Sequence, residues 1–595
     1  MTETLPRWHL EDLFQGPQAP DFQAALKEAQ TKTHAFVKAF SQQDFSAMGA
    51  DVFYQAILDY EALSTLFGKL GTYTFLLFSE NRNDMARAQV FQNTREALQT
   101  LESDLIFFTL ALCALSETRV QQLYETHLGI ARYRPWLTQV RLFQPHTLDE
   151  TSEKLMHDLH ITSRSGWVRL FDQIMAALRF SYRGDMLTET QVLHLMNTST
   201  DPDIRRDAAL AFSGGLESQK DTFALIMNNL VKDKATEDRW RHFSTPASSR
   251  HLQNQVEGEV VETLVQAVRD AYPTLSHRYY EHKARWLNQS TLNFWDRNAP
   301  LPKVPQPTYT WDQAKDIVLS AYQAFSPEMA TIGRRFFDQG WIHAAPDAGK
   351  DSGAYAHPCV PEVHPYILMN FKGSQRDVMT LAHELGHGIH QVLSAQQGYL
   401  MSDTPLTLAE TASVFGEMLT FQSLLKAAET PEQKRALTAA KIEDMLNTVV
   451  RQIAFHTFET KVHAARAEGE LSTEDLAALW MQVQTESLGP AITLSDPYKI
   501  YWTYIQHFIH SPFYVYAYAF GDCLVNALYA TYQKQPEGFA ETYITFLKKG
   551  GTQPYDIMLS AFGLNPKDPT FWQQGLSVIE GLIQSLTDTP TDKGA

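Results

Sequence analysis

The chain has 595 residues, of which 44% are hydrophobic and 20% are charged, and this is an ordinary globular composition. That composition excludes a disordered or fibrous protein, while the length favours several domains or one very large domain. The formal net charge of −18 opposes binding to nucleic acid or to an anionic membrane surface, because both are negatively charged.

The three cysteines, Cys113, Cys359 and Cys523, lie far apart in the sequence. Their odd number and the lack of a CxxC pair argue against a disulfide framework and against a thiolate metal site. The first residues do not combine a positive start with an apolar run, as a secretion signal would. We therefore expect a cytoplasmic protein. The negative net charge leads us to expect no nucleic-acid or membrane partner, and we expect a monomer or small homo-oligomer.

Helical periodicity dominates the N-terminal part of the chain. Apolar residues recur at three- and four-residue spacing over residues 46–78 and 97–117. The strongly apolar run at residues 105–115 is too short to cross a bilayer, which takes about 20 residues, and is typical of a buried helix.

A turn signal at residues 197–210 contains Pro202, and it predicts the start of a helix. We place a domain boundary just before it. The predicted domains are a helical N-terminal domain, residues 1–195, and a larger C-terminal domain, residues 196–595.

The best strand candidate is the segment HPYILMNF at residues 364–371. Its second residue is Pro365, which predicts an edge strand. An edge strand can hold an extended peptide through main-chain hydrogen bonds, so Met369 and Asn370 are candidate peptide-binding residues. A plain buried strand is an alternative interpretation of the same pattern.

The next element is a helix that carries the sequence TLAHELGHGIHQ at residues 380–391. Ser374 and Asp377 form a capping-box signal at its start. The helix is expected to run to about Gln397, with Gly398 just past its end.

His383 and His387 lie four residues apart on this helix, so their side chains share one face and can bind one tetrahedral Zn²⁺. Glu384 can lean over the same site as a base. His390 faces the same side but lies roughly 10.5 Å along the axis from His383, too far for a shared metal ion. The alternative is a surface helix whose histidines are satisfied locally.

Gly386 and Gly388 lie in the middle of the same helix. Glycine costs ~1 kcal/mol relative to alanine in a helix interior. Their presence predicts that another backbone or a metal shell approaches closely.

Residues 404–425 are predicted to form another amphipathic helix. Glu410 and Glu417 lie seven residues apart on one face, among apolar residues. A carboxylate in such surroundings needs a partner. We predict that Glu410 is a metal ligand and that Glu417 accepts a hydrogen bond that orients a histidine. The alternative is that either glutamate is a solvated helix residue.

Further along, Ser511-Pro512 predicts a helix that starts at Pro512. This part of the chain is rich in tyrosine and histidine, whose groups can stabilise an oxyanion. An aromatic core with locally satisfied hydroxyls is the alternative. The candidate hydrogen-bond donors are His507, His510, Tyr514 and Tyr518.

Several sequence blocks, in this order, resemble the oligoendopeptidase F branch of the thimet-oligopeptidase-like zinc peptidases over most of the chain. They are RWHLEDLF near the start, SGWVRLFDQ, GKDSGAYAHP, HPYILMNFKGSQRDVMTLAHELGHGIHQ, LAETASVFGEML and HFIHSPFYVYAYAFG. The resemblance implies a mainly α, zincin-like fold. In that family the fold is a large helical ellipsoid with a deep central substrate groove, and it would have a small β-sheet beside the HExxH helix. Residues 1–195 would be the oligoendopeptidase F-like domain and residues 196–595 the catalytic domain.

The resemblance also implies one Zn²⁺ per chain and a role for each matching residue. His383, His387 and Glu410 would be the ligands, Glu384 the general base and Glu417 the supporting glutamate. His507 and Tyr514 would act on the substrate or its oxyanion, with Tyr518 and His510 as further substrate-binding candidates. The thimet branch has a glycine-rich stretch after that histidine, where this chain has IHSPF.

The expected function is a zinc metallo-endopeptidase that hydrolyses internal bonds of short unfolded oligopeptides through zinc-activated water and a glutamate base. Two alternatives are a zinc carboxypeptidase of related fold and a peptide-binding helical protein without catalysis.

Overall fold

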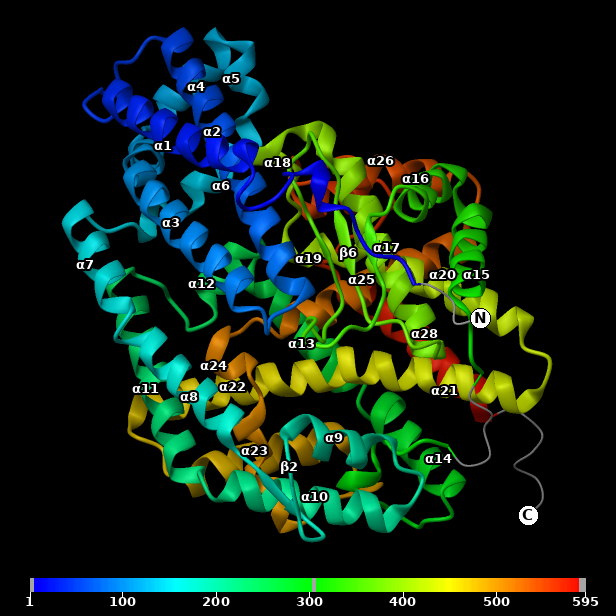
Figure 1. The fold of residues 1–595 in the computed structure, drawn as a ribbon. Coiled ribbons are helices and arrows are strands. Elements are labelled where there is room, and N and C mark those ends of the chain that lie inside the picture. Colours follow the sequence, from blue (N-terminus) through cyan, green and yellow to red (C-terminus); the bar gives the residue numbers. More distant parts are fainter. Residues whose placement is uncertain (1–4, 302–306, 588–595) are drawn as a thin grey trace. The chain divides into compact units, whose positions relative to one another are not determined.

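A computed structural model describes residues 5–301 and 307–587 and shows a mainly helical protein (Figure 1). The chain divides into two compact units that are interleaved in sequence. Unit 1 takes its described residues from Met1–Gln144, Gln306–Lys426 and Thr531–Gly563, and unit 2 from Pro145–Pro305, Ala427–Ala530 and Leu564–Ala595. Each unit thus draws on both sides of residue 195, so the compact units do not follow that boundary, and the two sequence domains stay a prediction.

Unit 1 begins with a helical bundle. Its helices are α1 (Pro20–Phe40), α2 (Ala50–Glu80), α3 (Met85–Ala114), α4 (Glu117–Thr126), α5 (Leu128–Arg132) and α6 (Arg134–Leu142). Among the described residues, only α3 has the length and hydropathy that could suit a membrane span. Leu105, Phe108 and Leu112 of its apolar stretch are buried in the core of the bundle, as the sequence predicts.

The rest of unit 1 surrounds a small sheet. Its helices are α15 (Trp311–Phe325), α16 (Pro327–Asp338), α17 (Gln375–Ser394), α18 (Tyr399–Ser402), α19 (Leu406–Ala409), α20 (Thr411–Ala427), α26 (Phe539–Leu547) and α27 (Tyr555–Ser560). α17 packs against α15, α16 and α26 and against strands β5 and β6 of the sheet. The predicted mainly α fold with a small sheet beside the HExxH helix is confirmed.

The sheet has three strands, β4 (Ile342–His343), β5 (Tyr355–His357) and β6 (Tyr366–Leu368), in the order β4-β6-β5. β4 pairs with β6 in parallel, and β5 pairs with β6 in antiparallel orientation. The prediction of an edge strand at residues 364–371 is therefore wrong, because β6 is central and fully buried. Pro365 lies before the paired residues, so it removes no hydrogen bond from the ladder.

α17 begins as the sequence predicts. Ser374 and Asp377 form a complete capping box. After Ser394 the helix tightens into a 3₁₀ turn, Ala395–Gln397, and Gly398 follows with φ +88°. That angle lies in the region that glycine adopts without strain.

Unit 2 is also built of helices. They are α7 (Glu150–His160), α8 (Arg164–Ala177), α9 (Glu189–Thr198), α10 (Pro202–Glu217), α11 (Lys220–Trp240), α12 (Ser248–Gln253), α13 (Gly258–Asp270), α14 (Arg278–Trp286), α21 (Pro431–Thr448), α22 (Val450–Glu468), α23 (Thr473–Leu488), α24 (His507–His510), α25 (Tyr516–Lys534) and α28 (Pro569–Thr587). Two-stranded sheets join β1 (Phe180–Tyr182) to β2 (Asp185–Leu187) and β3 (Leu292–Asn293) to β7 (Ile492–Thr493). Asp201 caps α10 at Pro202, which confirms the predicted helix start.

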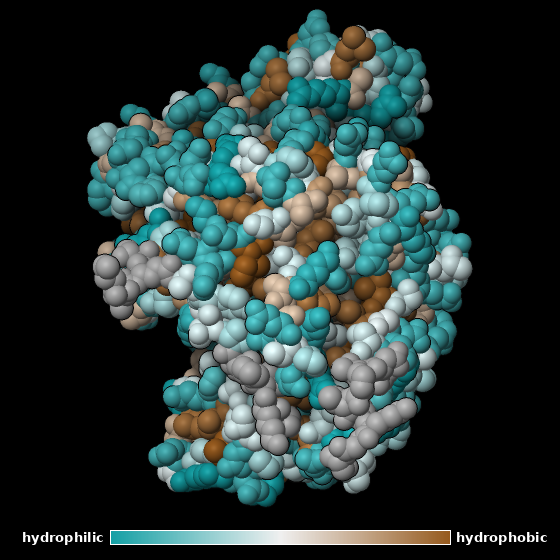
Figure 2. Space-filling view, turned by 90° about the vertical axis from the view of Figure 1, so that its right-hand side faces the viewer, coloured by the Kyte–Doolittle hydropathy of each residue, from teal (hydrophilic) through white to brown (hydrophobic). Residues whose placement is uncertain are grey.

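The surface is mainly hydrophilic on one face, as expected for a globular composition. On the face drawn in Figure 2, hydrophilic residues predominate and hydrophobic ones gather in smaller patches. The three cysteines carry free thiols, so the expectation that the chain has no disulfide framework is confirmed for the part that the structure describes.

Candidate functional site

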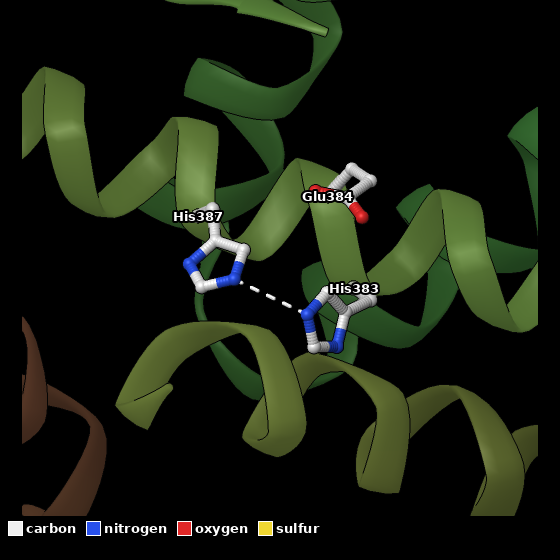
Figure 3. A group of neighbouring side chains, drawn as sticks. All are labelled: His383, Glu384 and His387. Carbon is white, nitrogen blue, oxygen red and sulfur yellow. Dashed lines mark hydrogen bonds between the residues drawn. The ribbon is translucent and has the colours of Figure 1, made fainter. Parts of the chain in front are cut away.

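The candidate site lies in unit 1, where α17 meets the start of α20. α17 carries His383 and His387, which face each other on one side of the helix (Figure 3). Residues 404–425 do not form the single helix that the sequence predicts. The helix is interrupted at Glu410, which lies between α19 and α20 with φ −77° and ψ −2°. This break sets Glu410 apart from the regular helix and lets its carboxylate meet the two imidazoles.

Three donor atoms form a nearly equilateral triangle. Nε2 of His383 and Nε2 of His387 lie 3.2 Å apart. Oε2 of Glu410 lies 3.4 Å from each of them. A tetrahedral Zn²⁺ with donors at about 2.0–2.1 Å has donor–donor separations of about 3.3–3.4 Å. The triangle therefore has the size of one face of a zinc coordination shell.

Neighbouring side chains hold this triangle in place. Oε1 of Glu417 lies 2.5 Å from Nδ1 of His383, so Nδ1 donates to Glu417 and Nε2 stays directed at the centre of the triangle. The hydroxyl of Ser413 donates to Oε2 of Glu410 over 2.7 Å. Such outer contacts fix the orientation of a metal ligand, and the contact with Glu417 also raises the basicity of His383.

The electrostatics of the triangle favour a cation. Burial by itself lowers the pKa of His383, but the hydrogen bond and charge of Glu417 raise that pKa to about 10. Burial by itself raises the pKa of Glu410, but the two histidines hold it well below its usual value. The Glu410 carboxylate is thus ionised and creates a negative potential at the histidines.

Glu384 lies next to His383 on α17, and Figure 3 shows it beside the histidine pair. It is 6% exposed, and ligand atoms of Glu384, His383 and His387 lie within 4.8 Å of one another. Burial raises the pKa of Glu384, while the histidines and a backbone hydrogen bond to Ala356 of β5 oppose this rise. A raised carboxylate pKa suits a group that takes up a proton and passes it on near neutral pH.

The structure removes the basis on which Met369 and Asn370 were predicted to bind peptide, since neither lies on a free strand edge. Met369 is buried, its N–H donates to the His343 carbonyl, and its own carbonyl accepts from the buried ammonium of Lys350. The amide of Asn370 donates to the Asp351 carbonyl. The strand beside α17 that pairs on one side only is β5, which sequence periodicity cannot find because it has three residues.

A cavity of about 650 Å³ lies next to the triangle, within unit 1. His387 and His390 line it from α17, and Cys359, Tyr399 and Asp403 line it from the chain segments around the helix. Burial lowers the pKa of His390 to about 3, so this histidine is neutral. The cavity is large enough for side chains of a peptide and opens beside a candidate metal ligand.

The candidate donors near the C-terminal end lie in unit 2. Nε2 of His507 lies 3.2 Å from the Tyr518 hydroxyl, and the Tyr514 ring stacks on His507 with centroids 6.1 Å apart. Nε2 of His510 lies 2.8 Å from Oδ1 of Asp172. The structure thus brings His507, Tyr514 and Tyr518 together, and their joint action with the histidines of unit 1 stays a prediction.

The predicted helix start at Pro512 is wrong. α25 begins at Tyr516, because Phe513 has φ +56° and cannot continue a helix. The N–H of Phe513 donates to Oε1 of Glu459 on α22 over 2.9 Å. Tyr514 therefore lies on a loop that a buried glutamate holds.

Sequence reasoning missed two contributors to the site, Ser413 and Ala356. Ser413 could have been found, because it follows Glu410 by three residues and its hydroxyl can reach back one turn. Ala356 carries no signal in the sequence, since only its backbone contacts Glu384 and only the folding of β5 brings it there.

A helical fold with an HExxH helix beside a small sheet defines a class of peptidases, and comparison with known proteins agrees. Residues 195–578, more than half of the chain, match the model of peptidase family M3, and residues 112–180 match that of oligopeptidase F. The chain belongs to peptidase family M3.

Known relatives and solved structures match nearly the whole chain. Oligopeptidase PepF of Bacillus subtilis is 25% identical over 591 residues, covering 98% of this chain and 87% of its own. A crystal structure from Chlamydophila abortus has a TM-score of 0.83 at 23% identity and covers 98% of both chains. Oligoendopeptidase-F from Enterococcus faecium has a TM-score of 0.72 at 20% identity, covering 96% of this chain and 98% of its own.

Proposed function

We propose that this peptidase is a zinc metallo-endopeptidase that hydrolyses internal bonds of short unfolded oligopeptides. The observation that carries the proposal is the donor triangle of His383, His387 and Glu410, whose edges of 3.2, 3.4 and 3.4 Å suit one Zn²⁺. Three protein donors leave a fourth position, as catalytic zinc sites do. A bound Zn²⁺ supplies Lewis acidity, which polarises a carbonyl and acidifies water.

The remaining chemistry belongs to side chains of this chain. Glu384 takes the proton of the attacking water and returns it to the leaving amine, a role worth about 10²–10⁴-fold in rate. Glu417 keeps the proton of His383 on Nδ1, so that Nε2 presents its lone pair. Ser413 keeps the carboxylate of Glu410 turned toward the histidines.

The decisive variant is Glu384→Gln. Glutamine has nearly the same shape but cannot accept the proton, so we expect zinc content near one per chain and hydrolysis reduced at least about 100-fold. Glu429→Gln, at an exposed position beyond α20, is the matched control and should behave as wild type. Substantial turnover by Glu384→Gln would remove this residue from the mechanism.

Peptide substrates separate the alternatives. An endopeptidase cleaves a peptide whether its C-terminus is free or amidated, whereas a carboxypeptidase requires the free carboxylate. Mass spectrometry of the products from both forms distinguishes them. A peptide-binding protein without catalysis would bind both forms and yield no products even with zinc present.

A further inference from the structure

A separate pocket lies within unit 2, lined by two arginines and by aromatic rings. Its volume is about 180 Å³. Arg297 and Arg451 line it together with Asn298, Tyr498 and Tyr504. No aspartate or glutamate is among the residues that line it in the described part of unit 2.

Two acidic residues that lie near the pocket arginines in sequence already have cationic partners. Asp296, next to Arg297, accepts from both Nε and an Nη of Arg205, at 3.0 and 2.6 Å. Glu443 accepts from Lys283 over 2.6 Å. These two carboxylates are therefore neutralised by ion pairs of their own.

The two pocket arginines have no carboxylate partner among the described residues. Neither Arg297 nor Arg451 forms an ion pair with any residue in the described chain. Nε of Arg297 is buried without a hydrogen-bond partner. Arg451 donates to the hydroxyl of Tyr504 over 3.1 Å, which is a neutral acceptor. Two guanidinium groups thus line one pocket without a counter-charge, in a chain whose net charge is −18.

Such an arrangement is costly unless an anion completes it. Taking a charge out of water is unfavourable when no opposite charge compensates it. The guanidinium fork matches the two oxygens of a carboxylate. A single water needs only about 10–15 Å³ of such space, so the pocket is far larger than one inorganic ion requires. Its aromatic wall suits an apolar group attached to the anion.

We propose that this pocket binds the carboxylate of a small molecule of amino-acid size, through Arg297 and Arg451, with the ligand's apolar part against the tyrosine rings.

The pocket borders the chain segment that leads to His507. Tyr504 ends the 3₁₀ helix η6 (Asp496–Tyr504), and α24 begins at His507. Burial and the charge of Arg451 lower the pKa of His507, so a bound anion acts on the electrostatics of that residue.

The probe is N-acetyl-phenylalanine, compared with its primary amide in thermal unfolding of the zinc-loaded full chain at constant ionic strength. A ligand that binds only the folded state raises Tm in a concentration-dependent way. We expect the acid to raise Tm and the amide to leave it unchanged. Equal shifts with acid and amide, or a shift with inorganic phosphate as large as with the acid, would overturn the carboxylate assignment.

Variants locate the binding. Arg451→Gln should weaken the acid at least tenfold, and Arg297→Gln should do the same if that chain folds. Arg466→Gln, on the same helix α22 but outside the pocket, is the matched control and should keep wild-type affinity. His387→Ala tests binding at the metal site instead, and the Tm shift should survive it. Undiminished binding by Arg451→Gln, or loss of binding in His387→Ala, would refute the proposal.

Discussion

Replacing Gly386 with alanine tests the contact that brings α17 and α20 together. A Cβ at Gly386 would lie 2.7 Å from Cα of Ser413 and 2.8 Å from the carbonyl carbon of Ala412, and closer still to the oxygen of that carbonyl. Real Cβ atoms essentially never come within 3.0 Å of another heavy atom. Because the clashing atoms belong to backbone, no change of rotamer can relieve the contact, and the two helices must move apart.

The displacement follows from the distances. Moving Cα of Ser413 from 2.7 Å to the 3.4 Å at which ordinary contact begins shifts the start of α20 by about 0.7 Å. Glu410 lies three residues before Ser413, so its carboxylate shifts as well. Metal–donor distances tolerate about 0.2 Å. We therefore expect zinc affinity to fall at least tenfold, which corresponds to about 1.4 kcal/mol.

The fold itself should survive this change. Overpacking costs about 1–3 kcal/mol. Alanine in place of a helical glycine returns about 1 kcal/mol. The net loss of unfolding free energy is therefore no more than about 2 kcal/mol, so a loss of zinc affinity would not reflect unfolding.

The assay is competition for zinc between the protein and a chelator, with thermal unfolding of the metal-free chain alongside. Gly388→Ala is the control on the same helix, because its Cβ would meet the ring of Phe336 at 2.6 Å rather than α20. A phenylalanine ring can shift, so this variant should keep wild-type zinc affinity. Gly386→Ala with unchanged zinc affinity and turnover would refute the reasoning.

The remaining predictions concern hydrogen bonding and pH. Glu417→Gln removes the charged acceptor 2.5 Å from Nδ1 of His383 and should weaken zinc binding about 10–100-fold in the same chelator assay; an unchanged affinity would contradict the role of Glu417. Burial lowers the pKa of His456 and of His463 to about 3, below the unfolded value of about 6.5, so their stabilisation is complete above pH 6.5 and is lost as the pH falls. Burial raises the pKa of Glu459 to about 8, so between about pH 8 and 4.5 this group adds to the free energy of unfolding as the pH falls. The two histidines and Glu459 together should lower the free energy of unfolding by about 1.4 kcal/mol per pH unit between pH 6.5 and 4.5. Glu459→Gln should make this decrease steeper, as measured by urea unfolding at a series of pH values. The same pH dependence in the variant and the wild type would contradict the role of Glu459.

Local spacing predicted the elements whose geometry depends on a few neighbouring residues. The capping box of Ser374 and Asp377 is complete within four residues, and it sets the start of α17 correctly. The four-residue spacing of His383 and His387 places both on one helix face by geometry alone. The glycines between and beside them predicted close packing, and Gly386 does lie against the backbone of α20.

Features set by tertiary partners could not be predicted in this way. β6 became the central strand because β4 and β5, of two and three residues, pair on either side of it. Strands that short carry no periodicity. α25 starts four residues later than expected, because Glu459 of α22 holds Phe513 in a left-handed conformation. Nothing in the sequence around Pro512 indicates that partner.

This difference explains why the candidate metal ligands could be predicted from the sequence, whereas the loop that carries Tyr514 could not. All of its predicted donors lie on two segments that meet at one contact, Gly386 against Ser413. Ser413 and Glu417, which hold Glu410 and His383, lie on the same α20 that makes this contact. One helix–helix contact therefore sets both the donors and their supports, and a movement of that contact acts on all of them at once. The position of Tyr514 depends instead on α22, because Glu459 of that helix holds the neighbouring Phe513. α22 is far from Tyr514 in the sequence, so the position of Tyr514 could be found only from the structure.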